Sequence, residues 1–320
     1  MRVGVLDDWQ NVARASADWS RLEAQAEVTV FPGAFASEDD AAAALAEFDV
    51  LLLMRERTPF PASLIERLPK LRMIALTGAR SPSLDTAACG KAGIVISTTG
   101  GTVSSVGTAE LTLGLMIAAS RRIVTGDAAI RAGRFQDGVE VGPVLVGKTL
   151  GIIGLGKIGS RMARYAAALE MKVVAWSRSL DEAGAVAGGA RLAASKAALL
   201  AEADVVTLHV PLSAGSRGLI GAAEIAQMKP GALLVNTSRA GLIDGAALLA
   251  ALHAGQIMAA LDVYEQEPLP ADDPIRTAPN TVLSPHLGYG TTDTFRQFYG
   301  ESIENILAFM NGAPLRFMNT

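Results

Sequence analysis

Residues 150–159 read LGIIGLGKIG, an apolar stretch that runs into a G-x-G-x-x-G turn at Gly154, Gly156 and Gly159. In a strand–turn–helix of this kind, the first glycine permits the tight turn and the second lets the backbone approach a pyrophosphate. The third lets the helix pack against the strand, and N–H groups at the helix start attract negative charge. We therefore predict a dinucleotide-binding turn, although a structural turn without a ligand has the same pattern.

The sequence around and beyond this turn alternates apolar runs with helix-like stretches. Continuous apolar runs are typical of strands that are buried on both faces of a parallel sheet. The expected strands are 149–153, 172–176, 204–209, 232–236, 257–262 and 281–284, with helices at about 157–169, 195–202, 222–228 and 244–254. Six parallel strands wound in this way predict the Rossmann dinucleotide-binding fold.

The sequence before the turn predicts a second, smaller α/β unit. Its expected strands are 2–7, 27–31, 49–54, 71–76 and 94–97, separated by helices at 38–47, 61–67 and 84–92. A long helical stretch, about 106–132, leads into the Rossmann unit, and another, about 292–311, follows its last strand. We expect this last stretch to pack on the first unit. The first unit is then discontinuous, and the cleft between the two units is the expected ligand site.

Composition limits the functions to be considered. A chain of 320 residues is long enough for two domains, and its net charge of −4 argues against nucleic acid or an anionic membrane as the main partner. The longest apolar run, around 111–119, is shorter than the roughly 20 residues that span a bilayer, so we expect a buried helix. The N-terminus does not resemble a signal peptide, and the single cysteine, Cys89, is expected to be a packed thiol. We therefore expect a cytoplasmic protein, and we expect no metal site.

Three chemically distinct side chains follow expected strands of the Rossmann unit, in the stretches NTSRAG, YEQEP and SPHLG. They are Arg239, Glu267 and His286. Interconversion of a 2-hydroxy acid and a 2-keto acid needs a cation that holds the carboxylate and a group titrating near neutrality that moves the hydroxyl proton. A carboxylate should orient that group. Arginine, histidine and glutamate fit these tasks, with Glu265 open as an alternative to Glu267.

The other two histidines have simpler interpretations. His209 ends a strand just before a proline and is expected to be structural. His253 lies near the end of a helical stretch and is expected at the surface.

The end of the second Rossmann strand indicates which nicotinamide cofactor is used. An acidic residue there binds the ribose 2′-hydroxyl of NAD, whereas an arginine accommodates the 2′-phosphate of NADP. The sequence reads WSRS, with Ser177 in the acidic position and Arg178 next to it, and no carboxylate occurs before Asp181. NADP is therefore favoured and NAD remains possible, since Arg178 is alternatively a solvated surface charge.

Taken together, these motifs resemble those of the D-isomer-specific 2-hydroxyacid dehydrogenases. GLGKIG, HVPL, MKPGALLVNTSRAGLID, ALDVYEQEPLP and SPHLG match the family's motifs in order and at similar spacing over essentially the whole chain. The resemblance implies an α/β fold of two doubly wound parallel-sheet domains. A Rossmann nucleotide-binding domain (101–287) is inserted into a discontinuous flavodoxin-like substrate domain (1–100 and 288–320). It also implies a homodimer joined through the nucleotide domains.

The resemblance also implies the site residues. It gives the catalytic roles to Arg239, Glu267 and His286, and it places the substrate on Arg239, on His286 and on backbone N–H groups around Gly78 and Ala79. Asp262 is expected on the nicotinamide side of the cofactor. The other expected cofactor-binding residues are Thr108, Gly154, Leu155, Gly156, Lys157, Ile158, Gly159, Ser177, Arg178, Ser179, Val210, Pro211, Thr237, Ser238 and Gly288.

The predicted function is hydride transfer between NAD(P)H and a small 2-keto acid, in the manner of a glyoxylate or hydroxypyruvate reductase. The substrate itself stays open, because Tyr289 and Arg80 depart from residues common in the family and the roles of Arg55 and Arg57 are undetermined. Two alternatives are a nucleotide-sensing binding protein of the corepressor type and a related dehydrogenase with an unusual donor such as formate or phosphite.

Overall fold

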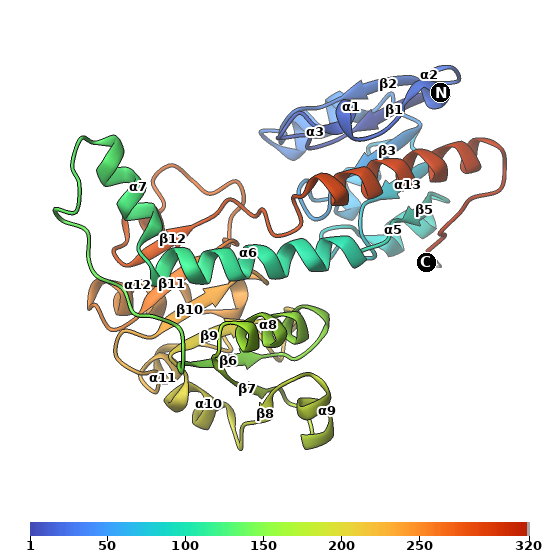
Figure 1. Ribbon diagram of the computed structural model, residues 1–320. Helices are drawn as coiled ribbons and strands as arrows, with labels where there is room; N and C mark the ends of the chain where they lie inside the picture. Colours follow the sequence, from blue (N-terminus) through green and yellow to red (C-terminus); the bar gives the residue numbers. More distant parts are fainter. Residues whose placement is uncertain (319–320) are drawn as a thin grey trace. The chain divides into compact units, whose positions relative to one another are not determined.

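The computed structural model describes residues 1–318, and the chain divides into two compact units. Unit 1 comprises Met1–Val103 and Gly290–Thr320, and unit 2 comprises Ser104–Tyr289. Each unit is an α/β structure built on a sheet whose strands pair in parallel (Figure 1). The predicted fold class, two doubly wound parallel-sheet domains, is confirmed.

Unit 1 contains a five-stranded sheet in the order β2-β1-β3-β4-β5. All five predicted strands are present: β1 (Arg2–Val5), β2 (Glu27–Val30), β3 (Val50–Leu53), β4 (Met73–Leu76) and β5 (Val95–Thr98). The helices are α1 (Ala13–Ser16), α2 (Ser20–Glu23), α3 (Glu38–Leu45), α4 (Ala62–Ile65), α5 (Thr86–Lys91) and α13 (Thr292–Met310). The C-terminal helix α13 packs against β4 and β5, and Figure 1 shows it beside β5. Beyond it, Phe317 forms an antiparallel bridge with Ser97 on the edge strand.

Unit 2 contains a seven-stranded sheet in the order β12-β11-β10-β9-β6-β7-β8. Its strands are β6 (Thr149–Ile153), β7 (Lys172–Trp176), β8 (Arg191–Leu192), β9 (Val205–Leu208), β10 (Leu233–Asn236), β11 (Met258–Leu261) and β12 (Thr281–Leu283). The prediction of six strands was wrong by one, because β8 is only two residues long and leaves no apolar run in the sequence. The chain reverses direction of winding between β6 and β9, and such a switch point is where these sheets bind ligands.

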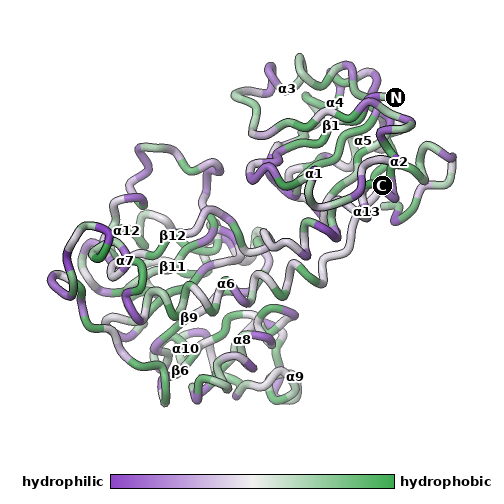
Figure 2. Tube along the Cα trace, turned by 45° about the horizontal axis from the view of Figure 1, so that its top comes forward, coloured by the Kyte–Doolittle hydropathy of each residue, from purple (hydrophilic) through white to green (hydrophobic). Residues whose placement is uncertain are grey.

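Helices cover both faces of the unit 2 sheet. They are α8 (Lys157–Ala168), α9 (Glu182–Ala187), α10 (Lys196–Glu202), α11 (Ala222–Ile225) and α12 (Gly245–His253), with 3-10 turns η1 (Ala240–Leu242) and η2 (Pro274–Thr277). One core joins α8 and α6 to the sheet, for example through Met116 and Met162. The other joins α10 and α12 to it, through Leu199 and Leu252. Figure 2 shows hydrophobic residues concentrated in the strands between these layers.

The long helix expected at 106–132 is two helices, α6 (Thr102–Ser120) and α7 (Ile123–Arg131). The break falls at Arg122, whose left-handed backbone (φ 53°) ends the helical path and whose guanidinium pairs with Glu140. The expectation of a buried helix was only partly right, because α6 buries one side, with Ala109, Met116 and Ala119 on it, and leaves the rest partly exposed. Among the residues that the structure describes, α6 is the one helix long and apolar enough for a membrane span, a test that core helices also pass.

Candidate active site

Three neighbouring strands of unit 2 end beside the three predicted catalytic residues. Arg239 follows β10, Glu267 follows β11, and His286 follows β12, and these strands are adjacent in the sheet. Because the strands are parallel, their carboxyl ends lie at one edge, where α/β sheets bind ligands. Strand order thus brings residues nearly fifty positions apart to the same edge.

Glu267 and His286 form a direct pair. The Oε2 atom of Glu267 lies 2.5 Å from Nδ1 of His286, and its Oε1 accepts a hydrogen bond from the backbone N–H of Tyr264 at 3.0 Å. A carboxylate can only accept, so the proton of the imidazole lies on Nδ1. Glu265 points elsewhere, since its side chain is 65% exposed and lies 3.8 Å from Arg217. The geometry therefore selects Glu267 over Glu265 as the partner of the histidine.

The backbone around His286 is held in an unusual conformation. His286 has a φ of 55°, in the left-handed region that a residue with a Cβ adopts at a cost. The fully buried Asp262 fixes the next two residues, because its carboxylate oxygens accept the N–H groups of Leu287 and Gly288, both at 2.8 Å. Burial raises the pKa of Asp262, and these hydrogen bonds oppose that rise. The carboxylate of Asp262 thus places the histidine loop.

Several of the predicted cofactor residues meet next to this loop. A Cβ at Gly288 would lie 3.1 Å from Asp262 and 3.3 Å from Thr108 of α6, so glycine eases the close approach of these segments. One turn along α6, Thr112 shares a 2.8 Å hydrogen bond with Thr237. The structure therefore brings Thr108, Thr237, Asp262 and Gly288 to one region of unit 2.

Arg239 is placed through its backbone. The amide of Asn236, at the end of β10, donates to the carbonyl oxygen of Arg239 at 2.9 Å and accepts from the N–H of Ser238 at 3.0 Å. The hydroxyl of Ser238 donates to the carbonyl oxygen of Val210 at 2.8 Å, which joins this loop to the end of β9. Asn236 was not identified from the sequence, although an asparagine at a strand end often forms hydrogen bonds to the backbone of the following loop.

The glycine turn has the geometry that its sequence predicts. Gly154 has a φ of 99°, and a Cβ there would lie 2.5 Å from the carbonyl oxygen of His209. A Cβ at Gly159 would lie 2.2 Å from the carbonyl oxygen of Gly154, whereas one at Gly156 would meet nothing within 4 Å. Two of the glycines are thus required by packing, and the third faces open space at the N-terminus of α8. This cradle fits a pyrophosphate.

The end of β7 carries no acidic residue that is available to a ribose. Asp181, the first carboxylate after Trp176, caps α9 by accepting the N–H of Gly184 at 2.8 Å. Ser177 is partly exposed, and Arg178 and Ser179 are exposed. The guanidinium of Arg178 reaches across to Gly215, in the loop after β9, where a Cβ would lie 2.6 Å from Nη1.

The loop after β4 in unit 1 carries the predicted backbone donors. Gly78 has a φ of 81°, but its N–H donates to the hydroxyl of Thr99 at 2.7 Å. Gly78 therefore supplies a backbone conformation and not, as expected, an N–H donor. Ala79 and Arg80 are exposed, and their N–H groups have no partner among residues 1–318. Arg55 lies against this loop, since a Cβ at Gly78 would touch its guanidinium.

The remaining histidines and the cysteine agree with their interpretations. His209 donates or accepts a 2.9 Å bond with Thr207, and burial lowers the pKa of His209 to about 3. His253 ends α12 and is exposed. Cys89 is fully buried, and burial raises the pKa of its thiol to about 11. The shifted pKa values of His209 and Cys89 lie far from neutrality, which does not suit an acid–base catalyst.

Comparisons with known proteins agree with this geometry. Residues 113–288 match the model of the D-isomer specific 2-hydroxyacid dehydrogenase NAD binding domain. The chain belongs to this family. It is 38% identical to a glyoxylate reductase of Aeropyrum pernix over 78% of its own length and 76% of that protein. It also resembles the crystal structure of a phosphoglycerate oxidoreductase from Vibrio cholerae, with a TM-score of 0.92, 36% identity, and coverage of 98% of this chain and 100% of that one.

Other relatives are much longer than this chain. It is 38% identical to a D-3-phosphoglycerate dehydrogenase of Methanocaldococcus jannaschii over 76% of its length but only 46% of that protein. The chain thus spans about half the length of such relatives. The predicted family, the D-isomer specific 2-hydroxyacid dehydrogenases, is confirmed. These relatives give no support to the corepressor, formate or phosphite alternatives.

Proposed function

We propose that the protein reduces a small 2-keto acid to the D-2-hydroxy acid and catalyses the reverse oxidation. The observation that carries this proposal is the 2.5 Å contact between Glu267 and Nδ1 of His286, next to the strand end that bears Arg239. A bound nicotinamide supplies or accepts the hydride at C2. The protein must then hold the carboxylate, move one proton at the C2 oxygen and stabilise the charges that develop.

His286 is the proposed proton donor for keto reduction. Its Nδ1–H is engaged by Glu267, so the proton exchanged with the C2 oxygen is carried by Nε2. The carboxylate of Glu267 stabilises the imidazolium form, and the Tyr264 N–H keeps that carboxylate in position. In the oxidation direction the neutral imidazole accepts the hydroxyl proton.

Arg239 is the proposed anion-binding residue of unit 2. A guanidinium binds a carboxylate through two parallel N–H groups and polarises a neighbouring keto oxygen. The hydrogen bond from the Asn236 side chain holds the backbone of Arg239, which fixes the position from which the Arg239 side chain extends. In unit 1, we assign the N–H groups of Ala79 and Arg80 to binding of a substrate carboxylate.

The proposed cofactor site is the glycine turn of unit 2, with Asp262, Thr108, Thr237 and Gly288 toward the nicotinamide. NADP is the preferred cofactor in this proposal. Asp181 caps a helix and is not free for the ribose 2′-hydroxyl of NAD, and Arg178, which follows Ser177, is suited to the 2′-phosphate of NADP. Arg178→Ala should lower the affinity for NADPH about ten- to a hundredfold and leave NADH nearly unchanged. Arg164→Ala, which removes an exposed arginine of α8, is the matched control.

A homodimer formed through unit 2 is the proposed assembly, and the cytoplasm the proposed location. The segment 123–146, which includes α7, exposes several large apolar side chains, among them Phe135 at 75% and Val141 at 97%. Exposed apolar side chains that lie together mark interaction sites. Phe135→Asp should convert a dimer to a monomer in light scattering. Val186→Asp, which changes an exposed apolar residue of α9, should not.

The test of the function is turnover of a panel of 2-keto acids. Glyoxylate, hydroxypyruvate, pyruvate and 4-methyl-2-oxopentanoate are each mixed with the enzyme and with NADPH or NADH, and loss of the reduced cofactor is followed by absorbance. Relatives named as reductases of three of these acids motivate the choice. We expect turnover of at least one acid, fastest with NADPH. Cofactor binding without turnover of any of them would overturn the proposal.

A further inference from the structure

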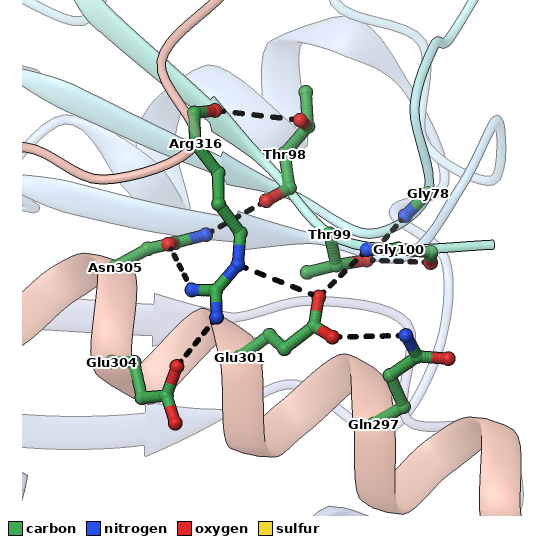
Figure 3. A network of polar contacts seen from close by, with 9 residues as sticks. All are labelled: Gly78, Thr98, Thr99, Gly100, Gln297, Glu301, Glu304, Asn305 and Arg316. Atoms are coloured by element: carbon green, nitrogen blue, oxygen red, sulfur yellow. Dashed lines mark hydrogen bonds and ion pairs between the residues drawn. The ribbon is translucent and has the colours of Figure 1, made fainter.

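A network of polar contacts in unit 1 fixes the segment that follows β5. The N–H of Gly100 donates to Oε2 of Glu301 in α13 at 2.6 Å, and Oε1 of Glu301 accepts from the amide of Gln297 at 2.9 Å (Figure 3). The side chain of Arg316, from the C-terminal segment, lies 3.8 Å from Glu301. The carboxylate of Glu301 therefore ties Gly100 to α13.

The same segment is tied a second time, two residues earlier, at Thr98. The amide of Asn305 donates to the carbonyl oxygen of Thr98 at 2.9 Å, and the N–H of Thr98 donates to the carbonyl oxygen of Arg316 at 3.0 Å. The guanidinium of Arg316 in turn donates to Asn305 at 2.8 Å and to Glu304 at 2.6 Å. Figure 3 shows these contacts converging on both sides of Thr99.

Thr99 connects this fixed segment to the loop after β4, which contains Gly78. Its hydroxyl, 4% exposed as a residue, accepts the N–H of Gly78 at 2.7 Å, and its own N–H approaches the carbonyl oxygen of Gly78 at 3.4 Å. On the other side of the loop, the hydroxyl of Thr77 donates to the carbonyl oxygen of Leu53 at 3.0 Å. Two buried hydroxyls thus fix Thr77 and Gly78, and the N–H groups of Ala79 and Arg80 that follow have no partner among residues 1–318.

We propose that Thr99 is a positioning residue for substrate binding. Its hydroxyl holds the Gly78 peptide in the one orientation from which the following two N–H groups bind the substrate carboxylate, and Glu301 holds Thr99 in place. The proposal rests on the proposed function, since it assumes a 2-keto acid substrate. It adds a residue that makes no contact with substrate or cofactor and that the motifs of the chain do not include.

Thr99→Val is the direct test. Valine keeps the branched shape and volume but cannot accept the N–H of Gly78. The KM for the 2-keto acid should rise about tenfold, the change expected from one lost hydrogen bond in a buried place, while kcat stays within about twofold. The dissociation constant of NADPH should not change, because its proposed site lies in unit 2. Thr99→Ser, which keeps the hydroxyl, should restore the wild-type KM.

Thr98→Val is the matched control, because the hydroxyl of Thr98 makes only a long 3.4 Å contact with the Arg316 carbonyl oxygen. Amide hydrogen exchange supplies a readout that does not depend on activity. The Gly78 amide should exchange faster in Thr99→Val than in wild type and be unchanged in Thr98→Val. Glu301→Ala should raise KM in the same direction by a smaller factor.

The outcomes separate the two proposals. Absence of turnover in the wild type would overturn the proposed function and this inference with it. Wild-type turnover with an unchanged KM in Thr99→Val would overturn the positioning role alone. A fall in kcat and in thermal stability together with the rise in KM in Thr99→Val, with no rescue by serine, would also overturn it. Such a result indicates a general structural defect.

Discussion

Units 1 and 2 hold their proposed ligand-binding groups in different ways. In unit 2 the groups are side chains at adjacent strand ends, such as the Glu267–His286 pair with its 2.5 Å contact. In unit 1 they are the backbone N–H groups of Ala79 and Arg80, placed by a glycine with a φ of 81° and a buried threonine hydroxyl. Most substitutions remove a side chain, whereas a backbone N–H is lost only on substitution by proline and is otherwise only redirected. Changes at the Glu267–His286 pair of unit 2 should therefore affect turnover, whereas changes in the unit 1 loop should affect substrate affinity.

The largest expected effect is on His286. His286→Ala removes the proton donor for keto reduction, and kcat should fall about 10²–10⁴-fold, as is typical for a general acid. The affinity for NADPH, measured by fluorescence titration, should stay close to wild type. His253→Ala is the control, because this exposed histidine lies at the end of α12. A parallel loss of cofactor affinity and turnover would instead indicate that His286 is structural.

Arg239→Lys should mainly weaken substrate binding. Lysine keeps the positive charge but cannot form two parallel hydrogen bonds with a carboxylate. The KM for the keto acid should therefore rise about ten- to a hundredfold, the range for a lost hydrogen bond between charged groups. Arg217→Lys, at an exposed arginine that contacts Glu265, is the control. A wild-type KM in Arg239→Lys would show that Arg239 does not hold the substrate.

Within unit 2, His209 should affect stability and not catalysis. The folded protein keeps His209 neutral down to a pKa of about 3, whereas the unfolded chain binds this proton below its ordinary value of 6.5. The unfolded state then binds more protons, so stability should fall as the pH drops from about 6.5 toward 3. At pH 5 this cost is about 2 kcal/mol.

His209→Gln should remove that part of the acid sensitivity. The measurement is the free energy of unfolding in urea at pH 7 and pH 5, with His253→Gln as the control. The pH-dependent loss should be smaller in His209→Gln than in wild type and unchanged in His253→Gln. An identical loss in all three proteins would contradict the buried neutral state of His209.

Glu267→Gln is expected to have the smallest effect of these substitutions. It should leave the fold intact and change the pH dependence of the oxidation rate. The glutamine keeps the shape but removes the negative charge that stabilises the imidazolium of His286, so the neutral imidazole should be favoured. The acidic limb of the oxidation pH–rate profile should then move to lower pH, by about one unit. Glu265→Gln should leave the profile unchanged. An unmoved profile in Glu267→Gln would exclude this carboxylate from the mechanism.

Most of the fold could be predicted from the sequence, because parallel strands buried on both faces leave continuous apolar runs. All five strands of unit 1 and six of the seven in unit 2 were found in this way. The two-residue β8 was missed because it is too short to form such a run, and the break at Arg122 was missed because no glycine or proline marks it. The short helices α1 and α2 have only four residues each and no periodicity to detect.

The side chains proposed for catalysis could be identified because their chemistry is specific to the residue type. The choice between Glu265 and Glu267 needed the structure, since two carboxylates two residues apart are equivalent in a motif. Thr99 could not be recognised, because every residue except proline has an N–H group and sequence does not show which hydroxyl will meet it. The partners of Gly78 follow from strand order, which places β5 next to β4.

The most direct test of this account is the rate of cofactor reduction with the separate D and L enantiomers of one 2-hydroxy acid, glycerate or lactate. Each enantiomer is supplied at saturation with NADP⁺ or NAD⁺, and formation of the reduced cofactor is followed by absorbance in the wild type and in His286→Ala. The account predicts reduction with the D enantiomer alone, fastest with NADP⁺, and its loss in His286→Ala. Reduction with the L enantiomer, or an equal rate in His286→Ala, would contradict it.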